Sequence, residues 1–106
     1  LDKRLIDFFN DMYFGGVDLD RRDPRLCPDR AQKPSDAPTA HIITAEYDPL
    51  RDEGEEYSQL LSAAGVQATY RCYDGLMHNF SLQTAVVALA NQAVGECAGF
   101  LKQQLA

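Results

Sequence analysis

An acid and a base follow the two segments of this sequence that are most typical of buried strands. Asp48 comes soon after the apolar run 41–45 (HIITA), and His78 follows a second β-rich run, 66–73 (VQATYRCY). The carboxyl ends of parallel strands lie at one edge of a sheet, where reactive groups gather. We therefore expect Asp48 and His78 to meet, although thirty positions separate them. An Asp that accepts from one imidazole nitrogen fixes the tautomer and leaves the other nitrogen to act as a base.

The elements that must position these residues alternate between strand and helix. Apolar residues at helical spacing predict a helix between the two strands, with Asp52 as its N-cap, Glu55 completing a capping box, and Gly65 at its end. A last helix is expected from about Gln83 to Leu105, where a broad apolar stripe recurs. This βαβα order predicts parallel strands in an α/β fold.

The N-terminal third of the sequence has a different character. Residues 1–16 predict a short amphipathic helix, and residues 17–38, with four of the five prolines, predict a long irregular connection. Residues 39–106 then carry the βαβα unit. Two parallel strands are too few for a stable sheet, and an apolar open edge invites aggregation. We therefore expect the C-terminal portion of a larger α/β domain, with the remainder of the sheet absent from this chain, which also begins without Met.

Composition argues against several classes of function. The 106 residues carry a net charge of −6 and no basic stripe, so neither nucleic acid nor an anionic lipid surface is an expected partner. The longest apolar-rich stretch, 85–90, is too short to span a bilayer. Three widely spaced cysteines without a CxxC pair argue against a disulfide framework or a zinc site. A cytoplasmic protein of one domain at most is expected.

The residues around Asp48 and His78 carry a specific resemblance. The run 45–66 (AEYDPLRDEGEEYSQLLSAAGV), followed by 73–80 (YDGLMHNF), closely resembles the C-terminal part of the hormone-sensitive-lipase-like family of α/β-hydrolase esterases, the acetyl esterase/lipase type. In that family the acid lies in a D-P-L-R-D-E stretch and the base in a G-x-x-H-x-F stretch. The upstream DPRLCP is similar to the family's D-P-R-x-S-P, with Cys27 in place of Ser. Asn79 stands where the family more often has Gly.

This resemblance implies a carboxylesterase or lipase that hydrolyses small, uncharged acyl esters without a cofactor. It makes Asp48 the acid of a Ser-His-Asp triad, and His78 its general base and acid. Glu46 is expected to hold the loop, while Leu50 and Met77 are candidates for substrate contact. Dimers through the last strand and helix are common among similar esterases, so a homodimer is among the expected assemblies.

The nucleophile is missing from the sequence. None of the four serines lies in G-x-S-x-G, and no HGGG-type segment is present to form an oxyanion hole; the serines are Ser35, Ser58, Ser62 and Ser81. The chain alone is therefore not expected to hydrolyse esters. The N-terminal half of the domain, from the same parent or a second chain, must supply both parts.

Other interpretations stay open at this point. The chain could be a hydrolase-like module that binds a small molecule without turnover, or a subunit that docks onto a partner chain. Metal chelation by Glu46, Asp48 and His78 is a less favoured alternative. The aromatic stripe of residues 8–14 is expected to pack in the core, and the alternative is that it lines an acyl pocket, as this segment often does in similar esterases.

Overall fold

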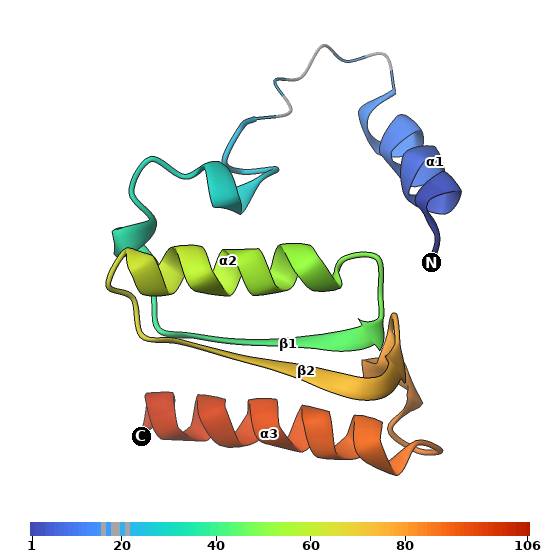
Figure 1. The fold of residues 1–106 in the computed structure, drawn as a ribbon, viewed down its shortest axis with the longest axis vertical. Coiled ribbons are helices and arrows are strands. Elements are labelled where there is room, and N and C mark those ends of the chain that lie inside the picture. The colour runs from blue at the N-terminus through green and yellow to red at the C-terminus, as the bar shows by residue number, and fades with distance from the viewer. Residues whose placement is uncertain (16, 18–19, 21) are drawn as a thin grey trace.

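Helices and strands alternate along the second half of the chain (Figure 1). The computed structural model describes residues 1–15, 17, 20 and 22–106. Its elements are α1 (Lys3–Phe14), β1 (Ala40–Tyr47), α2 (Arg51–Ala63), β2 (Ala68–Met77) and α3 (Ala88–Leu105), with short 3-10 helices at Pro28–Arg30, Pro34–Asp36 and Phe80–Gln83. β1 and β2 are parallel and pair along their lengths. The expected α/β architecture, two parallel strands with flanking helices, is confirmed as a partial fold.

Two helices cover the two faces of this sheet, α2 on one side and α3 on the other (Figure 1). On the α2 side, Gly54 approaches Thr44 so closely that a Cβ on Gly54 would lie 2.6 Å from Thr44 Cγ2. Thr44 Oγ1 in turn lies 2.8 Å from the hydroxyl of Tyr70 on β2. The core on the α3 side is formed by Ala45, Tyr73, Leu76 and Ala93. Small residues on both layers thus let the helices pack close to the strands.

α2 begins differently from the sequence-based expectation. Its N-cap residue is Leu50, and no side chain caps the helix, so the predicted capping box of Asp52 and Glu55 is wrong. Asp52 lies in the first turn instead, where its charge favours the positive end of the helix dipole. The other end is as expected, because Gly65 follows the helix with a φ of +83°.

The later elements also have shifted bounds. β2 continues to Met77, beyond the expected end at Tyr73. α3 begins at Ala88 rather than at Gln83, because residues 80–83 form a 3-10 helix of their own. β2 therefore ends at Met77, the residue immediately before His78.

α1 lies apart from the sheet (Figure 1). Its N-cap is Asp2, whose side chain accepts from the Leu5 N–H at 2.9 Å. None of its residues is buried, and the side chains of Phe9 and Tyr13 are 54% and 78% exposed. The expectation that the aromatic stripe packs in the core is therefore wrong for the described chain. Among the helices of the described ranges, none combines the length and the hydropathy of a membrane-spanning segment.

Candidate active site

Asp48 is the first residue after β1, and its carboxylate is held from two sides. The backbone N–H of Leu50 donates to Oδ1 at 2.9 Å, which closes a local turn. Oδ2 lies 2.9 Å from Nδ1 of His78. The Asp48 side chain is 15% exposed. Both of its oxygens are engaged, so the turn and the histidine together fix the orientation of the carboxylate.

His78 follows β2 and lies between two apolar anchors in the sequence. Leu76 is buried, and Phe80 is partly buried against the core, with its ring centroid 6.5 Å from that of Tyr73. The side chain of His78 is 26% exposed. An ionised carboxylate only accepts hydrogen bonds, so Nδ1 carries the proton and Nε2 offers its lone pair. The ring can therefore take a proton from a hydroxyl placed at Nε2.

The strand ends bring these two residues together, as the parallel order predicted. A second bond joins the same strands, because the Gly75 N–H donates to Oε2 of Glu46 at 2.7 Å. This bond links Glu46, near the end of β1, to the part of the β2 backbone that leads to His78. It agrees with the expectation that Glu46 holds the loop. The second strand expected from the sequence ends at residue 73, so Gly75 lies outside it, whereas β2 continues to Met77. A glycine within a β-type pattern is a known signal for a bulge.

Neither a serine nucleophile nor a set of metal ligands is assembled around His78 in the part of the chain that the structure describes. Ser58 is buried in α2, and Ser81 lies in the 3-10 helix after His78. Across the described residues, no serine hydroxyl is hydrogen-bonded to His78. In the same part of the chain, no three His, Cys, Asp or Glu side chains are grouped to hold a metal ion, so the metal alternative finds no ligand cluster.

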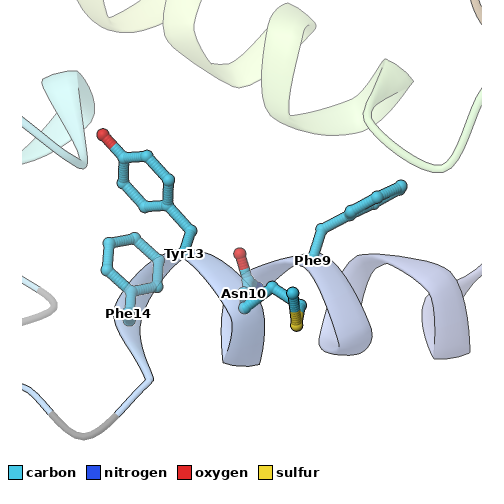
Figure 2. A pocket seen from close by; sticks show the side chains of 5 residues that line it. Phe9, Asn10, Tyr13 and Phe14 are labelled. Carbon is cyan, nitrogen blue, oxygen red and sulfur yellow. The ribbon is translucent and has the colours of Figure 1, made fainter.

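Apolar side chains surround the strand ends and α1. Tyr47, Leu50 and Met77 are 65%, 40% and 56% exposed. A separate open depression is lined by α1 alone, through Phe9, Asn10, Met12, Tyr13 and Phe14. Figure 2 shows the side chains of Phe9 and Tyr13 projecting to the same side of the helix. The strand ends and α1 thus both expose apolar side chains to solvent.

Sequence reasoning missed a polar cluster beneath α3. Glu96 accepts from the Tyr73 hydroxyl at 2.5 Å and from Arg71 at 2.7 Å. Its Oε1 lies 3.1 Å from His41 Nε2 without hydrogen-bond geometry, while His41 Nδ1 lies 2.7 Å from Thr69 Oγ1. The hydrogen bond from Tyr73 and the charge of Arg71 hold the pKa of Glu96 below its ordinary value, and burial raises the pKa of Tyr73. A lone Glu in a helix rich in Ala and Gly was the available signal.

In the DPR motif, residues 23–25, the aspartate and the arginine are hydrogen-bonded to each other. The guanidinium of Arg25 donates to Asp23 Oδ2 at 2.6 Å, and the Arg25 backbone N–H donates to Oδ1 at 2.9 Å. The side-chain bond and then the backbone bond lower the pKa of Asp23 to about 2. These contacts give the motif a local structural role at the start of the connection.

Known proteins resemble this chain over most of its length. A family model described as alpha/beta hydrolase fold matches residues 1–82. Esterase LipI of Mycobacterium tuberculosis is 39% identical over 93 residues, which cover 88% of this chain and 29% of that protein. Ethyl acetate hydrolase of Pseudomonas putida is 30% identical over 105 residues, which cover 99% of this chain and 33% of that protein.

A solved structure gives the same result in three dimensions. The Pyrobaculum calidifontis esterase matches with a TM-score of 0.90 and 37% identity, over 99% of this chain and 34% of that chain. The chain thus spans about a third of the length of these relatives. The family model includes both Asp48 and His78. On this evidence the chain belongs to the α/β-hydrolase fold family, in its hormone-sensitive-lipase-like branch.

Proposed function

We propose that this chain supplies the acid and the base of a serine carboxylesterase. The observation that carries the proposal is the 2.9 Å contact between Asp48 Oδ2 and His78 Nδ1 at the carboxyl edge of two parallel strands. The order acid before base agrees with the order Ser, Asp/Glu, His of α/β-hydrolases. The esterase names of the relatives support the same reaction.

In this mechanism His78 carries the proton transfers. Its Nε2 takes the proton of a serine hydroxyl as the serine oxygen attacks the ester carbonyl. The imidazolium then protonates the leaving alcohol, which leaves an acyl-enzyme. In the second half, His78 deprotonates a water that attacks the acyl group, and it returns the proton to the serine oxygen. Asp48 holds the ring in the productive tautomer and stabilises the imidazolium.

The serine and the oxyanion hole would come from outside these residues. The absence of G-x-S-x-G from the sequence supports this, as does the chain's share of about a third of its relatives. We infer that residues 1–16, 17–38 and 39–106 form the C-terminal portion of one hydrolase domain. The rest of that domain is then the principal partner, and the full-length protein containing both parts is the active enzyme.

Small, uncharged acyl esters are the proposed substrates. One relative is named for the hydrolysis of ethyl acetate, an ester of a short acid and a short alcohol. Around the Asp48–His78 pair, Leu50 and Met77 offer exposed apolar surface for such a group. The net charge of −6 disfavours anionic substrates.

The test is replacement of His78 in the full-length protein. His78→Ala should lower kcat for a short-chain p-nitrophenyl ester about 10⁴-fold, and Asp48→Asn should lower it about 10³- to 10⁴-fold. Asp52→Asn is the matched control, because Asp52 is an exposed acid four residues from Asp48. Undiminished hydrolysis by His78→Ala would remove His78 from the mechanism. A wild-type protein that binds the ester without turnover would support the binding-module alternative instead.

A further inference from the structure

The two strands change register just before the candidate site. From Ala40 to Ala45, each residue of β1 lies opposite the residue 28 positions later, whereas Tyr47 lies opposite Met77, 30 positions later. One residue of β1, Glu46, therefore spans three residues of β2. β2 contains a bulge with two extra residues at this point. Asp48 and His78 are also 30 positions apart, so the shifted register is the one that sets them opposite each other.

Gly75 forms the centre of this bulge. Its φ is +76°, a left-handed conformation that other residues adopt only at a cost. A Cβ at this position would meet no heavy atom within 4 Å, so the requirement for glycine is conformational rather than steric. Its N–H donates to Oε2 of Glu46, the residue opposite the bulge, at 2.7 Å. Hydrogen bonds to a carboxylate are among the stronger kinds, and this one closes the bulge.

The bulge decides where His78 lies. If residues 74–76 continued the regular pairing instead of forming the bulge, the register of the paired segment would place Leu76 opposite Asp48. His78 would then lie two positions beyond Asp48, about 7 Å further along the strand direction. We propose that Glu46 is a positioning residue, which holds the β2 bulge by its bond to the Gly75 N–H and so sets His78 against Asp48. The expected effect on catalysis rests on the function proposed above, whereas the geometric effect does not.

The test compares three variants of the full-length protein. Glu46→Ala removes the acceptor and should lower kcat for a short-chain p-nitrophenyl ester about 10- to 100-fold with KM changed less than about twofold, because the base is misplaced and not lost. Glu46→Gln keeps an acceptor oxygen of the same reach and should restore kcat to within about threefold of the wild type. Glu53→Ala is the matched control, since Glu53 is an exposed acid in the first turn of α2.

A second readout needs no turnover. Nitrogen-15 NMR of the His78 ring should show a protonated Nδ1 with a strongly deshielded proton in the wild type and in Glu46→Gln, and loss of that proton signal in Glu46→Ala. If the wild type fails to hydrolyse esters, the proposed function fails, and this signal still tests the positioning role. An unchanged signal and kcat in Glu46→Ala, or an equal loss in Glu46→Gln, would overturn the inference.

A variant on β2 keeps the inference testable if Glu46→Ala fails to fold. Gly75→Ala perturbs the same bulge while Glu46 keeps its side chain. It should weaken the signal of the deshielded Nδ1 proton in the same way. If Glu46→Ala does not fold, this variant decides the question. A Gly75→Ala protein with the wild-type His78 signal would show that the bulge does not position the ring.

Discussion

Asn79 is the residue at which the chain turns away from His78. It has a φ of 62° and a ψ of 26°, the left-handed region. Its carbonyl accepts from the Leu82 N–H at 3.0 Å, so the turn leads directly into the 3-10 helix at Phe80–Gln83. Asn tolerates this conformation better than most residues do, since its short polar side chain makes local hydrogen bonds. The departure from the Gly that is more frequent in the family therefore leaves the loop geometry intact.

This position should discriminate between side chains by backbone strain. Asn79→Gly should change the free energy of unfolding by less than about 0.5 kcal/mol, whereas Asn79→Val should lower it by about 1–2 kcal/mol, because a β-branched residue is strained at positive φ. The measurement is urea unfolding of the full-length protein. The glycine variant is the matched control for loss of the Asn side chain. Equal stability of the valine and glycine variants would contradict a left-handed Asn79.

At the scale of single residues, the contact between Asp48 and His78 was predictable from the sequence, whereas the Glu46–Gly75 bond beside it was not. The meeting of Asp48 and His78 followed from one rule, that parallel strands end at the same sheet edge, while their roles as acid and base came from the resemblance to the esterase family. The Glu46–Gly75 bond escaped prediction because a bulge breaks the two-residue period on which strand patterns depend. The Asp52 cap was wrong because Asp48, upstream, already satisfies the entry to α2: its side chain accepts from Leu50, and its carbonyl from the Arg51 N–H at 3.0 Å.

At the scale of the elements, α3 is held against the sheet by hydrogen bonds and ion pairs of one glutamate as well as by apolar packing. Its Glu96 is met by His41 from β1 and by Arg71 and Tyr73 from β2. The guanidinium of Arg71 also lies 4.5 Å from the centroid of the Tyr73 ring. Sequence periodicity gave the helix and its apolar stripe. It did not give these contacts, because they depend on the rotation of α3 against strands more than twenty residues away in the chain.

The pKa of Glu96 predicts how stability varies with pH. The hydrogen bond from Tyr73 lowers this pKa below the ordinary value of 4.5, so the carboxylate stabilises the folded state above that pH, and the stabilisation is lost as pH falls through the lowered pKa. Glu96→Gln should reduce the free energy of unfolding by on the order of 1 kcal/mol at pH 7. The difference from the wild type should shrink steadily below pH 4.5.

Urea titrations of both proteins between pH 3 and pH 8 would measure this difference. Glu53→Gln serves as the control, because Glu53 is exposed in the first turn of α2. A Glu96→Gln deficit that stays constant across this range would mean that the glutamate contributes through packing rather than through its charge.

The molecule as a whole exposes more surface than its mass requires. Its accessible area is 7927 Å², against about 5,900 Å² for a compact protein of 11.8 kDa. Its radius of gyration is 15.6 Å, against about 13 Å for a compact domain of this length. The excess of about 2,000 Å² exceeds what one partner contributes to a standard protein interface. The exposed apolar side chains of α1 and the edges of the two-stranded sheet are surfaces that other strands and helices of a hydrolase domain would cover.

The 106-residue chain alone should therefore self-associate and unfold over a broad range of urea, whereas the full-length protein should be monodisperse and unfold cooperatively. Size-exclusion chromatography with light scattering and urea titration measure both properties. Phe9→Ser sharpens the comparison: in the isolated chain it should reduce association, because it removes exposed apolar area. In the full-length protein it should lower the free energy of unfolding by about 3 kcal/mol, because a covered aromatic is lost.

Leu105→Ser is the matched control for this pair of measurements, since Leu105 is 83% exposed at the end of α3. The two effects expected for Phe9→Ser, weaker association of the isolated chain and lower stability of the full-length protein, follow from one physical cause, the covering of α1 by the rest of the domain. A cooperative monomer of the isolated chain would contradict the proposal that strands are missing. Unchanged stability of the full-length Phe9→Ser protein would show instead that the α1 face stays open to solvent, and is then available to a substrate or a partner.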